Sequence, residues 1–155
     1  MRKIKRVVVM AVGSGGDVAP MASVAAALAD RGFESTLLAP VRYRHFTEGT
    51  GVAFQSIGAD AIFAEVFDGQ DIWHPLKGSS AAWRYYGSAM RSGLQTLRQG
   101  WSASDTLLVS SSFAVAARLA EELDGYPNTT VHLSPSVIFS AHRPAKWPAF
   151  SIPPA

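Results

Sequence analysis

The chain has 155 residues, of which 48% are apolar and 17% are charged, a composition typical of a folded domain rather than a disordered segment. This length fits one domain with a useful core. The net charge of +2 and the scattered basic residues do not suggest a nucleic-acid partner, and the lack of cysteine excludes disulfides and thiolate metal sites. We therefore expect one globular domain, and a cysteine-free chain fits a cytoplasmic location.

The basic start Met1–Arg6 is followed by apolar residues, as in a secretion signal. The apolar run is short, however, and it enters Gly13 without a small-residue cleavage pattern. We therefore interpret Lys3–Val12 as a first strand with a solvated basic lead-in, which is compatible at most with peripheral contact with acidic lipid heads. No stretch approaches the roughly 20 apolar residues that a membrane span needs.

A glycine-rich turn, Gly13–Pro20 (GSGGDVAP), follows this strand and precedes a helical pattern. The unbroken apolar run Val7–Val12 predicts a strand buried on both faces. Open α/β sheets bind ligands at such turns, because glycines let backbone N–H groups approach closely and the helix N-terminus favours negative charge. Pro20 suits the first helical turn, where its missing N–H costs nothing.

Two known binding motifs contain such a turn, and each can be compared with this sequence. A Walker-type phosphate loop needs Lys and then Ser or Thr after its last glycine, where Asp17 and Val18 stand. A dinucleotide fingerprint needs a third glycine at Val18 and an acidic residue after the second strand, where Ala39 and Pro40 stand. The first use is excluded and the second is weakly supported.

Asp17 places a carboxylate at the mouth of the turn, and it has two interpretations. It is either a helix-end carboxylate that the local dipole stabilises by roughly 0.3–1 kcal/mol, or a general base that takes a proton from an incoming hydroxyl.

Further elements follow in βα order. Apolar residues at helical spacing over 21–29 predict a helix that stops near Gly32, and Thr36–Ala39 predicts a second strand. A short helix over Val41–Gly49 and a third strand over Val52–Ile57 come next. This order predicts parallel strands with right-handed crossovers and a ligand crevice at their carboxyl ends.

Residues 59–80 predict a long, partly irregular excursion, a type of segment that often carries binding elements. An amphipathic helix is predicted next, and its arginines are expected to face solvent. Its aromatic stripe is either a core stripe, which we favour, or the wall of an acceptor crevice. The stripe consists of Trp83, Tyr86, Met90, Leu94, Leu97 and Trp101.

The last elements are a fourth strand over Thr106–Ser110, a helix over Phe113–Asp124 with Leu123 inward, and a fifth strand over Thr129–Leu133. The predicted fold is therefore α/β, a doubly wound Rossmann-like parallel sheet with helices on both faces. The histidines match no metal-ligand spacing, and we predict no metal.

The stretch GSGGDVAPMASVAAALADRGFESTLLAP resembles the opening of bacterial glycosyltransferases of the two-domain B-type fold, whose first loop commonly reads G-S-x-G-D-V-x-P. Three further segments resemble the same family in the same order: Asp71–Pro75, Val131–Ser136 and Ser140–Pro144. The nearest resemblance is to the rhamnosyltransferase and sterol glucosyltransferase subgroup. It covers nearly the whole chain.

The resemblance implies an acceptor-binding half of a hexosyltransferase that uses a nucleotide-diphosphate sugar, no other cofactor, and a hydrophobic hydroxylated acceptor. Asp17 matches the position proposed as general base. Ser14, Gly15 and Gly16 match the loop that faces the donor phosphates, although Gly16 replaces the Arg or Ala found in many relatives.

Four more residues match acceptor-side positions. Trp73 and His74 match a loop motif near the acceptor pocket, where the indole either stacks on the acceptor or anchors the loop. His132 and Ser134 match the strand that ends at the cleft floor, with His132 as either a ligand contact or a hydrogen-bonded core histidine.

The chain is short for this family. We expect residues 1–155 to be a single N-terminal acceptor-binding Rossmann-like domain, truncated near its C-terminal end, without the donor domain that would be its partner. We expect no turnover from the chain alone. The alternatives are a dinucleotide-binding oxidoreductase-like domain and a non-catalytic binding module.

Overall fold

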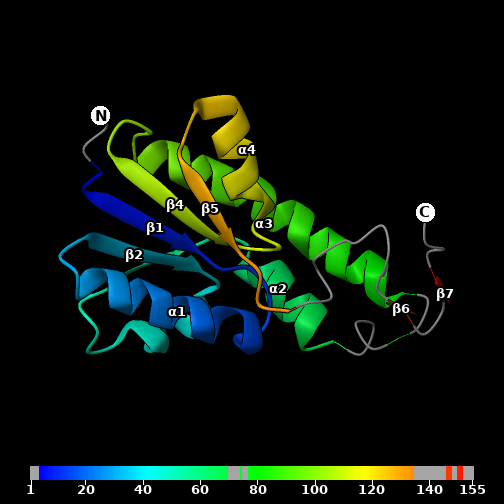
Figure 1. Cartoon of the computed structure of the whole chain (residues 1–155). Helices are drawn as coiled ribbons and strands as arrows, with labels where there is room; N and C mark the ends of the chain where they lie inside the picture. Colours follow the sequence, from blue (N-terminus) through cyan, green and yellow to red (C-terminus); the bar gives the residue numbers. More distant parts are fainter. Residues whose placement is uncertain (1–3, 70–73, 75–76, 135–145, 148–149, 152–155) are drawn as a thin grey trace.

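The computed structural model describes residues 4–69, 74 and 77–134, together with the backbone of 146–147 and 150–151. A five-stranded sheet in the order β3-β2-β1-β4-β5 forms the centre, and every pair of neighbouring strands in it is parallel (Figure 1). The strands of the sheet are β1 (Arg6–Met10), β2 (Glu34–Ala39), β3 (Ala53–Ser56), β4 (Thr106–Ser111) and β5 (Asn128–Val131).

Helices cover both faces of this sheet, which confirms the predicted doubly wound α/β fold. They are α1 (Gly15–Ala29), the 3-10 helix η1 (Val41–Thr47), α2 (Asp60–Phe67), α3 (Gly78–Gly100) and α4 (Val115–Asp124). A separate antiparallel pair, β6 (Lys146–Trp147) and β7 (Phe150–Ser151), follows.

Alternate residues of β1 explain how one strand serves two cores. Val7 and Val9 pack with α1, while Val8 and Met10 face the layer of α2, α3 and α4. All four side chains are fully buried. The continuous apolar run therefore gives a central strand with no solvent face, as the sequence predicts.

The first helix begins earlier than its proline suggests. Its N-cap is Ser14, so Pro20 lies inside the helix rather than at its start. Because proline has no N–H, the carbonyl of Gly16 receives no bond from position 20, and Gly16 is exposed to water that can take that place. The helix therefore tolerates the proline, and the glycine turn is itself its first turn.

The region expected to be an irregular excursion contains a regular helix, α2, over Asp60–Phe67. Phe63 and Val66 are its buried residues. Ile62 and Phe67 of the same helix are partly buried against the core. The helix has only eight residues, and the Asp and Gly residues around it are typical of irregular segments.

The stripe assigned to the core of α3 is also rotated from the observed one. Trp83 is 68% exposed, whereas Tyr85 is fully buried. The buried face consists mainly of small residues at a spacing of four, together with Tyr85 and Leu97: Gly78, Ala81, Tyr85, Ala89, Gly93 and Leu97. Small residues let α3 approach the sheet and α4 closely.

This close approach is centred on Gly93. A Cβ atom there would stand 3.2 Å from Cβ of Ala116 in α4 and 3.3 Å from Ile57. Helix α4 buries its alanines, and Leu123, predicted to face inward, is 64% exposed. Leu123 is the second-last residue of α4, at the end of the helix beyond its buried alanines.

Candidate functional site

Asp17 lies in the first turn of α1, which follows the carboxyl end of the central strand β1. Gly13 adopts a φ of +130°, which L-residues with side chains rarely adopt. A Cβ atom on Gly13 would stand 2.8 Å from the carboxylate carbon of Asp17. The absent side chain of Gly13 therefore makes room for the Asp17 carboxylate.

One oxygen of the Asp17 carboxylate is fixed by Ser14. The Ser14 N–H donates to Oδ2 at 2.8 Å, and the Ser14 hydroxyl donates to the same oxygen at 3.0 Å. Asp17 occupies the third position of α1, so this is the helix-capping contact that acidic residues make there. Among the described residues, nothing donates a hydrogen bond to Oδ1. The Asp17 side chain thus caps the helix through Oδ2, while its Oδ1 receives no hydrogen bond from the described residues.

Tyr43 lies beside this first turn. A Cβ atom on Gly15 would stand 3.5 Å from Cε1 and 4.0 Å from Oη of Tyr43. Burial raises the pKa of Tyr43, the Arg42 guanidinium opposes that rise, and the Asp17 charge adds to it. The phenol is therefore near enough to sense the carboxylate.

Helix α2 holds η1, and with it Tyr43, at two points. Val41 N–H donates to Asp60 Oδ1 at 2.6 Å, and the Ser56 hydroxyl donates to the other oxygen of Asp60 at 2.6 Å. Arg42 forms a two-pronged ion pair with Asp68, at 3.0 Å for each hydrogen bond. Bidentate pairs of this kind fix geometry as well as charge.

Two further tyrosines of α3 approach the turn from the opposite face of the sheet. Burial, followed by the negative charge of Asp17, raises the pKa of Tyr86 to about 12. Burial raises the pKa of Tyr85 further, and the Gly13 amide opposes part of that rise. Among the described residues, none completes a hydrogen bond of good geometry to the Tyr85 hydroxyl. The charge of Asp17 therefore contributes to the raised pKa of two tyrosines, Tyr43 and Tyr86.

The ends of β4 and β5 complete the edge. The Ser111 hydroxyl accepts the Val12 N–H at 3.3 Å, which ties the end of β1 to β4. The Ser112 hydroxyl lies 3.1 Å from His132 Nδ1. His132 is exposed at the end of β5, so it is not the core histidine of the second interpretation.

Two other predicted acceptor residues, His74 and Ser134, lie within the described part of the chain. His74 precedes α3, where its Nδ1 accepts the Lys77 N–H at 3.3 Å and its carbonyl accepts the Gly78 N–H at 2.8 Å. His74 thus helps to begin α3. Ser134 is exposed just beyond β5. Trp73 lies outside the described residues.

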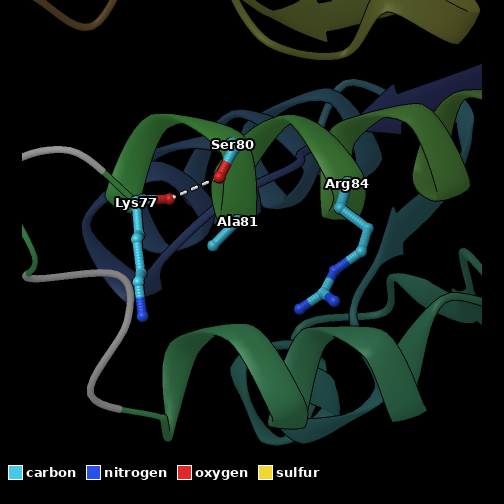
Figure 2. A pocket seen from close by; sticks show the side chains of 4 residues that line it. All are labelled: Lys77, Ser80, Ala81 and Arg84. Carbon is cyan, nitrogen blue, oxygen red and sulfur yellow. Dashed lines mark hydrogen bonds between the residues drawn. The ribbon is translucent and has the colours of Figure 1, made fainter.

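A separate open hollow of about 290 Å³ lies at the N-terminal end of α3. Figure 2 shows Lys77, Ala81 and Arg84 pointing from α3 toward the neighbouring helix. Arg84 pairs with Glu65 of α2 at 2.9 Å, and both side chains are more than half exposed. This exposed pair contributes less than about 1 kcal/mol, so the hollow is chiefly the gap where α3 meets α2.

Within the described part of the chain, no three His, Asp or Glu side chains cluster as metal ligands would. None of the described helices combines the length and apolarity of a membrane span. At the dinucleotide position, Val18 is fully buried against the sheet, and β2 ends at Ala39 without a carboxylate for a ribose.

Sequence reasoning identified Asp17 and its turn but missed Tyr43 and Tyr85. Tyr85 stands between Ala81 and Ala89 at a spacing of four, and this small-residue register would have marked it as buried. Tyr43 carries no comparable signal, because its position depends on how α2 holds η1.

Comparison with known proteins gives the family and the fold. The model of the glycosyltransferase family 28 N-terminal domain matches residues 7–141. Among curated proteins, no sequence matches the chain. The calicheamicin glycosyltransferase CalG4 is similar in structure, with a TM-score of 0.64, 19% identity and coverage of 85% of this chain and 33% of its own.

Two solved complexes are similar as well. TcCGT1 in complex with UDP has a TM-score of 0.64 and 12% identity over 85% of this chain and 29% of its own. SsfS6 of Streptomyces sp. SF2575, complexed with thymidine diphosphate, has a TM-score of 0.58 and 18% identity over 83% of this chain and 38% of its own.

The chain thus spans about a third of the length of these enzymes. At these sequence identities the structural similarity shows only the fold. The family assignment rests on the match to the N-terminal domain of glycosyltransferase family 28. By its parallel sheet, its glycine turn and this match, the chain belongs to the family of glycosyltransferase family 28 N-terminal domains.

Proposed function

We propose that this chain is the acceptor-binding half of a glycosyltransferase that moves a hexosyl group from a nucleotide-diphosphate sugar to a hydroxyl of a hydrophobic small molecule. The observation that carries the proposal is the Asp17 carboxylate, which Ser14 holds at Oδ2 and whose Oδ1 receives no hydrogen bond from the described residues. Glycosyltransferases of this type need no cofactor beyond the nucleotide sugar.

In this proposal Asp17 is the general base. A neutral alcohol is a poor nucleophile, so its proton must leave as the oxygen attacks the sugar carbon and the bond to the diphosphate breaks. Oδ1 of Asp17 receives that proton, while Ser14 keeps the carboxylate from rotating. The acid form then loses its proton to solvent.

The first turn of α1 has a second role in the proposal. The N–H groups of Gly15 and Gly16 belong to the set that a helix leaves without an intrahelical partner. Aimed at the departing diphosphate, they would stabilise its charge. The UDP of TcCGT1 and the thymidine diphosphate of SsfS6 support a nucleotide-diphosphate donor but do not decide which base this enzyme uses.

The remaining parts of the proposal concern the rest of the enzyme and its acceptor. We propose that residues 1–155 form one acceptor domain and that the donor domain is a separate half, without which the chain does not turn over. The ordered motifs support the rhamnosyltransferase and sterol glucosyltransferase subgroup, with His74, His132 and Ser134 on the acceptor side and Trp73 as a fourth member.

The test joins the chain to the donor-binding half of a related glycosyltransferase and measures glycoside formation from UDP- or thymidine-diphosphate-glucose. We expect no product from the chain alone and steady product from the joined protein. Asp17→Asn should lower the rate by about 100-fold or more, whereas Asp30→Asn, an exposed carboxylate at the other end of α1, should not change it. An unchanged rate for Asp17→Asn would show that Asp17 is not the general base.

A further inference from the structure

Three aromatic rings form a continuous line on the surface beside Asp17, which we call the aromatic track: Trp83, Tyr86 and Phe113. The Tyr86 and Phe113 rings are stacked, with centroids 5.1 Å apart and planes at 19°. Trp83 meets Tyr86 edge-on, with centroids 6.2 Å apart and planes at 74°. Trp83 is 68% exposed and Phe113 is 41% exposed, so both end rings are open to solvent.

The track is continuous with the candidate site. Phe113 follows the carboxyl end of β4, the same edge of the sheet at which the glycine turn lies. Ser111, two residues before Phe113, accepts the Val12 N–H at 3.3 Å, and Val12 directly precedes the turn. The middle ring, Tyr86, is partly buried against the core, and the charge of Asp17 adds to the rise that burial gives its pKa. The track therefore lies at the edge of the sheet that carries Asp17.

Resting on the proposed function, we propose that the aromatic track binds a flat ring system of the acceptor face to face, with a ring hydroxyl directed at Asp17. The track thereby selects flat hydroxylated rings over hydroxylated alkyl chains. Trp83 and Phe113 are specificity-determining residues in this scheme, and they take no part in the proton transfer.

The ring geometry favours a flat ligand. Aromatic rings prefer offset stacking or edge-on contact with other rings, and such contacts add attraction beyond the area that they bury. Tyr86 and Phe113 already stack in this way, so a ligand ring on the open face of Phe113 would extend an existing stack. An alkyl chain gains only buried area from the same surface.

The middle ring of the track, Tyr86, is also held in place before a ligand arrives. Tyr86 contacts Tyr85 with centroids 5.4 Å apart, and Tyr85 is fixed in the core between Phe63 and Phe67, at 5.2 and 5.3 Å. A surface whose rings are fixed loses little side-chain entropy on binding.

The test measures binding of three probes to the chain by equilibrium dialysis: 2-naphthol, 2-methoxynaphthalene and 1-octanol. The proposal predicts that 2-naphthol binds at least about fivefold more tightly than 1-octanol. Trp83→Ala and Phe113→Leu should each weaken 2-naphthol by about three- to tenfold and leave 1-octanol within about twofold. Phe113→Leu keeps an apolar side chain of somewhat smaller volume and removes the ring.

The matched control is Leu123→Ala, which removes an equally exposed apolar side chain on α4 and should leave all three affinities unchanged. Equal or tighter binding of 1-octanol, unchanged affinities in both track variants, or no binding of any probe would overturn the proposal. So would a protein-concentration dependence in sedimentation that Trp83→Ala abolishes, since a second copy would then occupy the track.

A separate arm tests the proposed function. If 2-naphthol binds more tightly than its methyl ether and Asp17→Asn abolishes that difference, the ring hydroxyl meets Asp17, as proposed. If the two bind equally while the track variants still weaken both, the ring site stands, and the role of Asp17 in holding the hydroxyl fails.

Discussion

Gly13→Ala is the most informative single change in the turn. The substitution adds one carbon at a position where φ is +130° and where that carbon would stand 2.8 Å from the carboxylate carbon of Asp17. No rotation of a methyl group relieves this contact. Asp17 must therefore swing away from Ser14, or the turn must deform.

The expected loss of stability follows from two terms. A non-glycine residue in this φ region costs about 1–3 kcal/mol. Losing the contact between Asp17 and the Ser14 N–H costs about 0.5–2 kcal/mol, the usual value of a helix cap. Together these predict that Gly13→Ala lowers the free energy of unfolding by about 1.5–5 kcal/mol, a large part of the stability of a domain of this size.

Gly16→Ala is the control in the same turn. A Cβ atom on Gly16 meets only Ser14 Oγ, at 3.7 Å, so we expect no loss and a gain of up to about 0.5–1 kcal/mol. Urea unfolding followed by tryptophan fluorescence measures both variants. If Gly13→Ala is within 0.5 kcal/mol of the parent, a difference of roughly the ordinary scatter between surface variants, the steric argument is wrong.

Three further predictions concern α3. Tyr85→Phe should raise the free energy of unfolding by up to about 1–2 kcal/mol, because it removes a buried hydroxyl without a partner among the described residues; a loss in urea unfolding would show that the hydroxyl is bonded. Asp17→Asn should lower the pKa of Tyr86 from about 12 while leaving it above 10, since burial is the larger cause. Phenolate absorbance, with Tyr86→Phe subtracted, would test this, and an unchanged pKa would contradict it. Because the unfolded tyrosine ionises first, the parent should lose stability as pH rises from about 10 to about 12, and the loss should be smaller in Tyr86→Phe. Gly93→Val should cost about 1–3 kcal/mol by overpacking α3 against α4, whereas Gly87→Val, with only Arg91 at 3.9 Å, should cost less; equal losses would point to helix propensity instead.

The centre of the sheet could be predicted from the sequence because β1, β2 and β4 carry apolar runs between turn residues. β1 and β2 differ from their predicted ranges by a few residues only, and all five strands are parallel as expected. Such runs have few alternatives to a buried parallel strand once helical patterns separate them.

The helices were harder to predict where small residues do the packing. In α3 large aromatic residues suggest a core stripe, but the close contact at Gly93 requires the alanine and glycine face to turn inward. Trp83 is then carried to the surface. Hydrophobicity alone would bury a tryptophan before an alanine. Only the tertiary contact at Gly93 therefore determines which face of α3 is buried.

The candidate site divides in the same way. The glycine turn and Asp17 are local features, because a φ that requires glycine and a helix-capping acid are both set within a few residues. The placement of Tyr43 depends on ion pairs between η1 and α2, 26 residues apart in the case of Arg42 and Asp68. Contacts between such distant residues leave no periodic trace in one sequence.

The central claim is that Asp17, at the end of the turn from Gly15 to Asp17, meets an acceptor hydroxyl. An amide NMR titration of the chain with a hydroxylated apolar ligand, a nucleotide-diphosphate sugar and NADH tests it most directly. We predict saturable shifts at Gly15, Gly16 and Asp17 with the hydroxylated ligand, lost in Asp17→Asn, and little effect of NADH. Saturable shifts at the same amides with NADH, and none with the hydroxylated ligand, would contradict the account and make the turn a dinucleotide site.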